Sequence, residues 1–210
     1  MFAYCNNNPT SACDSTGTFA QYCFAKDDSR GGLPYIYNQE AEPFASMQLG
    51  DYNVGYAGCG AVAAYNALIS MGDYEPFDDV LAYFNGAYNR TFANGMFGIL
   101  PWQVGAFFES RGYYVVYTFD NKSIDYNSNF ADASIMFFVF PRHGTVAGIT
   151  KTWSGAHFVE YSRVGEEFRG RNINRMTAMT EFDSPYEFGH RGSRFYVIGI
   201  HIYPGELAYD

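Results

Sequence analysis

Residues 53–72 have the sequence NVGYAGCGAVAAYNALISMG, in which a cysteine stands between two glycines and a run of small apolar residues follows. The apolar residues recur at helical spacing and also fill the opposite side, so the run predicts a helix over residues 60–71 that is buried nearly all round. Gly72 follows as its C-terminal stop, because glycine readily adopts the left-handed conformation that ends many helices. The stretch therefore places Cys59 at the start of a buried helix.

Further elements are predicted on either side of Gly112. Pro76 and Pro101 each open a helix, since proline is favoured at the first helical position. Beyond Gly112, short β-branched and aromatic segments bounded by turn residues predict five strands: Tyr113–Phe119, Ser134–Phe140, Ala156–Val164, Glu167–Ile173 and Phe195–Tyr203. Gly165 and Glu166 predict a tight hairpin between two of these strands. This order indicates an α+β domain, with N-terminal helices packed on a C-terminal antiparallel sheet.

The composition excludes several classes of protein. With 48% hydrophobic and 17% charged residues, the 210-residue chain can bury a sizeable core and is not disordered as a whole. Acidic residues outnumber basic ones 22 to 13, and the net charge of −9 argues against nucleic-acid and anionic-membrane partners. No apolar run approaches the ~20 residues of a spanning helix, and residues 1–5 lack the features of a secretory signal. We therefore expect a soluble chain that is not exported by the general route.

Aromatic residues are unusually frequent, at 20% of the chain. Large flat side chains favour twisted sheets over a helical bundle. Their even spread along the chain favours an ordinary aromatic core and surface, while a platform for glycans or peptides is the alternative.

The cysteines argue against a metal site. Cys5, Cys13 and Cys23 lie close together near the start, Cys59 stands apart, and no C-x-x-C pair occurs. No phosphate-binding loop or cofactor motif is present, so we expect neither a cofactor nor a metal.

Residues 1–32 predict an irregular arm, because clusters of Asn, Asp, Ser, Gly and Pro are typical of turns and Gly31-Gly32 is typical of a linker. The main domain is then residues 33–210. The arm resembles the end of the core associated with Rhs (YD-repeat) proteins, which closes with an aromatic pair, Asn-Asn-Pro and Asp-Pro-x-Gly. The matching residues are Phe2-Ala3-Tyr4, Asn7-Asn8-Pro9 and Asp14-Ser15-Thr16-Gly17, with Ser15 in place of the family's proline.

In that family the segment joins a large shell to a variable C-terminal toxin, often released by self-cleavage near the Asp-Pro. The resemblance implies that residues 33–210 are the toxin tip of a bacterial effector, delivered outside the cell as part of a larger protein. It also implies a cognate immunity protein as partner.

Cys59 is the candidate nucleophile. The first turn of a helix presents unpaired N–H groups and a partial positive charge, which lower a thiol pKa, and the flanking glycines leave room for a substrate carbonyl. The alternative is that Cys59 is a small buried apolar residue, the usual fate of a free cysteine.

A nucleophilic thiol needs a base and a group that orients the base. His157 is the candidate base, because it follows a turn-like segment and opens a predicted strand facing the helix. His143, His190 and His201 are expected to be structural or solvated. On the next predicted strand, Asn172 or Asn174 could accept the imidazole Nδ1–H through its amide oxygen. We prefer Asn172, and Asp183 is a weaker option.

The remaining requirement is an oxyanion hole, formed by the Cys59 N–H and a side-chain amide upstream of it. Asn53 is the candidate donor, and Gln48 lies further upstream.

These residues together resemble papain-like cysteine peptidases, particularly the C39-like branch. That branch has Gln, four residues, Asp-Cys-Gly, a small-residue helix ending in Gly, then Gly-His-[Phe/Tyr]-Val on a strand and a later Asp or Asn. This chain has Asn53, residues 58–60 (Gly-Cys-Gly), residues 156–159 (Ala-His-Phe-Val) and Asn172. Asn53 replaces the Gln, and Gly58 replaces the Asp.

The resemblance covers roughly residues 33–203. It implies a papain-like fold and a thiol hydrolase, a cysteine peptidase, with a protein or peptide substrate: Cys59 attacks, His157 is base then acid, and Asn172 orients the ring. Two other functions stay open. One is a glutamine deamidase or transglutaminase-like toxin on the same residues, and the other is a non-catalytic aromatic binding module.

Overall fold

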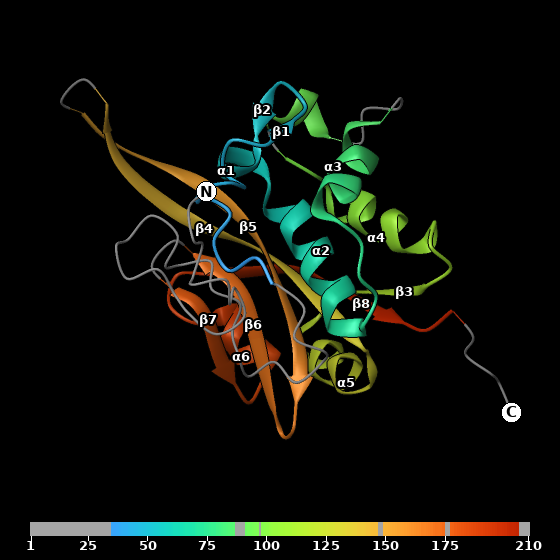
Figure 1. Ribbon diagram of the computed structural model, residues 1–210. Coiled ribbons are helices and arrows are strands. Elements are labelled where there is room, and N and C mark those ends of the chain that lie inside the picture. Colours follow the sequence, from blue (N-terminus) through green and yellow to red (C-terminus); the bar gives the residue numbers. More distant parts are fainter. Residues whose placement is uncertain (1–34, 87–90, 97, 147–148, 175–176, 206–210) are drawn as a thin grey trace, which may run out of the picture.

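The computed structural model describes residues 35–86, 91–96, 98–146, 149–174 and 177–205 (Figure 1). In this part of the chain a six-stranded sheet has the strand order β3-β8-β4-β5-β6-β7, with every neighbouring pair antiparallel. Its strands are β3 (Tyr114–Thr118), β4 (Ala133–Val146), β5 (Ile149–Val164), β6 (Glu167–Asn174), β7 (Thr177–Phe182) and β8 (Phe195–Tyr203). The arm of residues 1–32, with its three cysteines and the Rhs-like segment, lies outside the described residues.

The other elements are shorter. A separate two-stranded sheet contains β1 (Gln48–Leu49) and β2 (Tyr52–Asn53). The helices are α1 (Val54–Ala57), α2 (Cys59–Met71), α3 (Phe77–Asn85), α4 (Pro101–Glu109), α5 (Asn121–Phe130) and α6 (Pro185–His190), and η3 (Phe92–Gly95) is a 3-10 turn.

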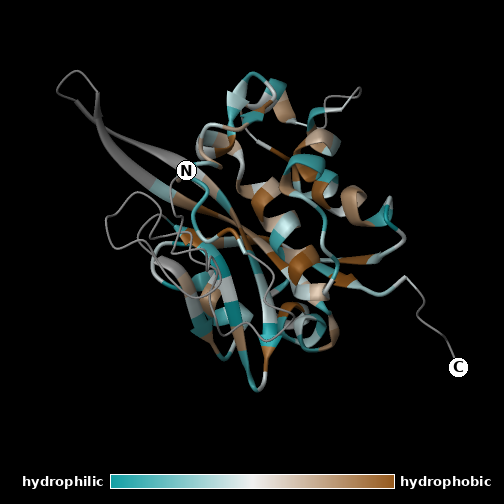
Figure 2. Ribbon diagram, viewed as in Figure 1, coloured by the Kyte–Doolittle hydropathy of each residue, from teal (hydrophilic) through white to brown (hydrophobic). Residues whose placement is uncertain are grey.

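Helices cover both faces of the main sheet, and each face has its own apolar core. The larger core joins α2, α3 and α4 to one face, where Phe158 of β5 packs. The smaller core joins α5 and α6 to the other face, around Val159 and Tyr161. Successive residues of β5 thus enter different cores, as the alternation of side chains along a strand requires. Figure 2 shows apolar residues along α2 and the central strands.

Helix α2 forms as the sequence predicts. It is buried along almost its whole length, and Gly72 ends it with φ 85°, in the left-handed region that glycine adopts without strain. Asn66, a buried polar residue of α2, is satisfied by Ile36: the Ile36 N–H donates to Asn66 Oδ1 at 2.8 Å, and Asn66 Nδ2 donates to the Ile36 oxygen at 2.9 Å. This pair attaches the segment before α1 to α2.

The α+β class and the antiparallel sheet are confirmed, and Gly165 turns the β5–β6 hairpin with φ 67°. The prediction that helices are confined to the first half is wrong, because α5 and α6 lie between strands of the second half. Strand β7 was also not expected.

Strands β4 and β5 are longer than the sequence predicts, and together they form a ribbon that projects from the body of the molecule (Figure 1). Strand β8 pairs with β4 only as far as Val139, so beyond that point β4 and β5 pair with each other alone. His157 consequently lies inside β5 and does not open a strand.

A buried ion pair joins β5 to β6 beneath α2. Arg171 Nη1 lies 2.9 Å from Glu160 Oε2, and the two side chains are 1% and 0% exposed. Ser70 of α2 donates to Glu160 Oε1 at 2.6 Å, Arg171 donates to Ser162 Oγ at 3.0 Å, and the guanidinium lies 4.0 Å from the centre of the Tyr35 ring. Such a pair persists in a core because its remaining polar atoms are hydrogen-bonded.

His201 is structural, in line with the sequence analysis. It is fully buried in β8, with Nδ1 2.9 Å from Ser134 Oγ and Nε2 2.8 Å from Thr118 Oγ1. Burial lowers its pKa to about 4, because the imidazolium would lose its hydration.

Stability should therefore fall in mild acid. Between pH 6.5 and about 4 the unfolded chain takes up a proton at His201 that the folded chain does not, so the free energy of unfolding falls with falling pH, by about 2.5 kcal/mol on reaching pH 4.5. Urea unfolding at pH 7 and pH 4.5 measures this loss. The difference between the two pH values should shrink in His201→Gln, and an unchanged difference would assign the acid sensitivity to other groups.

In the described part of the chain, none of the helices has both the length and the apolar character needed to cross a membrane.

Candidate active site

Cys59 is the first residue of α2 and is half-buried. Burial raises the pKa of its thiol above the ordinary value, while main-chain hydrogen bonds at Phe158, at Gly60 and at Cys59 itself oppose this rise to a smaller extent. The prediction that the helix terminus lowers the thiol pKa is therefore wrong in its net direction, because desolvation outweighs the N–H groups. The thiol is therefore neutral at pH 7, and a nucleophilic attack by it would need a base.

The glycines beside Cys59 serve packing. A Cβ on Gly58 would lie 2.5 Å from Val54 Cγ1 and 2.6 Å from the Val54 Cα and oxygen, and a Cβ on Gly60 would lie 3.0 Å from Ile99 Cβ. Both glycines are buried. They let α2 begin in close contact with α1 and with the segment before α4, and they do not open space for a substrate as we expected.

His157 and Asn172 meet, through atoms other than those expected. The imidazole Nε2 lies 2.6 Å from the main-chain oxygen of Asn172. A carbonyl oxygen only accepts, so Nε2 carries the proton and Nδ1 of the neutral ring is the basic nitrogen. The sequence analysis expected the Nδ1–H to bind the Asn172 amide, and both the ring nitrogen and the acceptor differ from that expectation.

The backbone of Asn172 explains this contact. Asn172 has φ 58°, in the left-handed region, and the β6–β7 register shifts between Arg171 and Asn174. The β5–β6 ladder runs up to the pair Glu160–Arg171, so the Asn172 carbonyl is released from it and can face His157. Asn174, the alternative, is exposed at the end of β6.

Cys59 and the imidazole of His157 lie on opposite faces of β5. Phe158 packs under α2, so His157 leaves the strand on the other face, where its ring lies edge-on to Phe138 with the centroids 6.0 Å apart. The hydrogen bonds that oppose the rise in the Cys59 pKa come from the main chain and not from the imidazole. The thiol lies beside Phe158, the residue next to His157, at the point where β6 has left the ladder.

The predicted oxyanion donors lie on the surface before α2. Asn53 is exposed and caps α1, with its Oδ1 accepting from the Tyr56 N–H at 2.9 Å. Gln48 is exposed and donates to the Gly50 oxygen at 3.0 Å.

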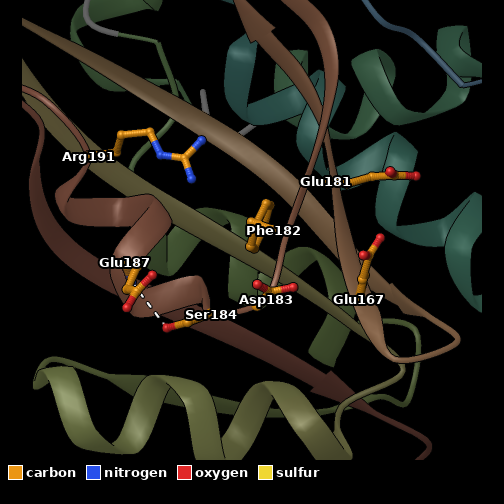
Figure 3. A pocket seen from close by; sticks show the side chains of 7 residues that line it. All are labelled: Glu167, Glu181, Phe182, Asp183, Ser184, Glu187 and Arg191. Carbon is orange, nitrogen blue, oxygen red and sulfur yellow. Dashed lines mark hydrogen bonds between the residues drawn. The ribbon is translucent and has the colours of Figure 1, made fainter.

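Asp183 lies far from His157. It follows Phe182, which pairs with Phe168 near the β5–β6 turn, at the opposite end of β6 from Asn172. There it lines a polar surface pocket of about 270 Å³ (Figure 3), together with Glu167, Glu181, Phe182, Ser184, Glu187 and Arg191. Asp183 is therefore excluded as the group that orients His157.

Of the other histidines, the two whose side chains the structure describes, His190 and His201, lie away from Cys59. His190 Nδ1 lies 2.8 Å from the Tyr186 oxygen, in α6 on the far face of the sheet. The side chain of His143 is outside the described part of the structure.

Gln39 belongs to the candidate site, and the sequence analysis missed it. It is buried, its N–H donates to Asn172 Oδ1 at 3.1 Å, and Asn172 Nδ2 donates to its Oε1 at 3.1 Å. Its own Nε2 donates to the oxygens of Val54 at 3.3 Å and Gly55 at 3.4 Å. No sequence signal marks Gln39, because the contact joins residues 133 positions apart.

Among the described residues, no cluster of three or more His, Cys, Asp or Glu side chains could hold a metal ion. The comparison of the chain with protein-family models and with curated proteins found no match.

Proposed function

We propose that this protein is a thiol hydrolase of the papain-like type, a peptidase, with Cys59 as nucleophile and His157 as base. The observation that carries the proposal is that the Cys59 sulfur lies against the main chain of Phe158, the neighbour of a histidine whose Nε2–H is fixed by Asn172. Fixing Nε2–H leaves Nδ1 as the proton acceptor.

In the proposed reaction the imidazole leaves the Asn172 carbonyl, turns toward the Cys59 side of β5 and takes the thiol proton on Nδ1 while the sulfur attacks a peptide carbonyl. The Cys59 N–H, with Asn53 as second donor, stabilises the oxyanion. His157 then protonates the leaving amine, and a thioester remains on Cys59. Water, deprotonated by His157, hydrolyses the thioester and releases the acid.

Thiol labelling in the full-length chain tests the pair. Because burial raises the pKa of Cys59, an unassisted thiol should react with iodoacetamide more slowly than an ordinary cysteine at pH 7. With His157 as base, Cys59 should instead react at least about tenfold faster than in His157→Ala, as mapped by mass spectrometry. Cys5, Cys13 and Cys23 serve as internal references. Equal rates in the wild type and His157→Ala would overturn the proposal.

A glutamine deamidase or transglutaminase-like enzyme would use the same thioester. A target glutamine that gains about one mass unit without cleavage of the chain would select this reaction. The Rhs-like arm supports an effector context, with delivery outside the cell and an immunity protein as partner. A gene neighbourhood with neither an Rhs-type sequence nor a small downstream gene would count against that context.

A non-catalytic binding module is the second candidate, favoured by an aromatic patch where α5 meets β3 and β8. Tyr126 and Phe130 are 67% and 65% exposed with ring centroids 5.1 Å apart, and Tyr114 lies 6.2 Å from Tyr203. Tyr203 is joined to α5 by its hydroxyl, which donates to Asn127 Oδ1 at 3.0 Å. Glycan or peptide binding that survives Cys59→Ala would select this function.

A further inference from the structure

Gln39 is the residue that connects the histidine side of the site to the cysteine side. With Asn172 it forms a closed pair of hydrogen bonds, both 3.1 Å long, in which each residue donates once and accepts once. The remaining amide protons of Gln39 are directed at the oxygens of Val54 and Gly55 in α1. Both Gln39 and Asn172 are buried, so the pair is shielded from competition by water.

The pair acts on the backbone of Asn172. A residue other than glycine rarely adopts a positive φ, and Asn tolerates it best because its short amide can bond locally. At Asn172 both ends of the amide are held by Gln39, so the side chain fixes the direction of the main-chain carbonyl. That carbonyl accepts the His157 Nε2–H at 2.6 Å.

The other end of Gln39 reaches the segment that leads into Cys59. Val54, whose oxygen accepts from Gln39, also accepts from the Gly58 N–H at 2.8 Å, which closes α1 immediately before Cys59. One buried side chain therefore bonds to the group that fixes the imidazole and to the helix that precedes the nucleophile.

We propose that Gln39 is a positioning residue, which holds the Asn172 carbonyl against His157 and so sets the tautomer and the place of the imidazole relative to Cys59. The proposal rests on the proposed function for its effect on chemistry, and its effect on the tautomer stands on geometry alone. Loss of the link releases the imidazole from its Nε2–H form, so that a fraction of the rings carries the proton on Nδ1, the nitrogen that has to accept the thiol proton.

The first measurement reads the tautomer by ¹⁵N NMR of the imidazole in the full-length chain. We expect the Nε2–H form for His157 in the wild type and a substantial Nδ1–H fraction in Gln39→Met, which keeps the side-chain length and loses the amide. Asn172→Gly keeps the left-handed backbone and loses the pair, so it should match Gln39→Met and stands in if that variant does not fold. An unchanged tautomer in both variants would overturn the proposal.

The second measurement is the pH profile of Cys59 alkylation. The His157-dependent part of the rate should fall at least about tenfold in Gln39→Met, because a displacement near 1 Å has effects of this size or larger. The double variant Gln39→Met/His157→Ala should be no slower than His157→Ala alone. Additive losses would show that Gln39 does not act through His157.

Asn66→Leu is the matched control, since Asn66 makes a similar buried amide pair with the backbone of Ile36, away from His157. It should lower the melting temperature and leave both the tautomer and the pH profile unchanged. If His157→Ala itself leaves Cys59 alkylation unaltered, the proposed function falls, while the tautomer measurement still decides the role of Gln39.

Discussion

Arg171→Met should lower the free energy of unfolding by about 3–5 kcal/mol, because it leaves the Glu160 carboxylate buried without its cation. Glu160 is 0% exposed, and the hydrogen bond from the neutral Ser70 hydroxyl does not replace a guanidinium at 2.9 Å. Chemical denaturation of the full-length chain at pH 7 measures the loss. Replacing both charges, in Glu160→Leu/Arg171→Met, should recover most of it, since no charge then remains buried.

Arg169→Met is the control on the same strand. Arg169 pairs with Glu181 at 2.9 Å, but the Glu181 side chain is 45% exposed, so its loss should alter stability by less than about 1 kcal/mol. A similar loss for both variants would mean that burial does not set the strength of these pairs. A double variant as unstable as Arg171→Met would assign the loss to packing against Tyr35 instead of charge.

Gly58→Ala should destabilise the protein by about 3 kcal/mol and disturb the start of α2. The φ of Gly58 is −86°, which alanine adopts freely, so the difficulty is space: the added methyl group would lie 2.6 Å from the Val54 Cα and oxygen. Gly58→Asp, which introduces the residue that the C39-like pattern has at this position, should be at least as damaging. Thermal unfolding measures the loss of stability. The rate at which Cys59 is labelled reports how far the start of α2 is displaced.

Gly72, at the other end of α2, gives the comparison. A Cβ there would meet nothing within 4 Å, and only its φ of 85° disfavours a side chain. Gly72→Asn should therefore change stability by less than about 1 kcal/mol, since Asn tolerates the left-handed region. If Gly58→Ala is as mild as Gly72→Asn, α1 moves aside easily and the contact between the two helices does not place Cys59.

The elements that the sequence predicts well are those that are apolar almost throughout their length. Helix α2 is apolar on all sides and is stopped by glycine, and β8 is a continuous apolar run, so a buried location is the outcome that packing permits in each case. Helix α5 was missed because its sequence, NKSIDYNSNF, is rich in Asn, Asp and Ser, which favour turns when considered locally. It forms because Ile124 enters the second core and Ser128 lies 2.8 Å from the Tyr161 hydroxyl.

The sequence predicts which residue types form the candidate site and their order along the chain. It does not predict how these residues are arranged in space. Cys59 lies at the start of a helix and His157 meets Asn172, as the sequence indicates. Regular alternation along β6 cannot foresee the left-handed residue at Asn172, and it is this break that turns the carbonyl toward the histidine. The face on which His157 lies is decided by Phe158, whose ring the α2 core requires.

The contact between Gln39 and Asn172 spans 133 positions of the chain, and this has a consequence for biosynthesis. During translation Cys59 leaves the ribosome long before His157 and Asn172 exist, so the proposed nucleophile is made without its proposed base. The closing of this loop is entropically costly and comes after the local helices have formed. Under the proposed function the nascent chain therefore carries a dormant thiol, which becomes reactive only when β5 and β6 have joined the sheet.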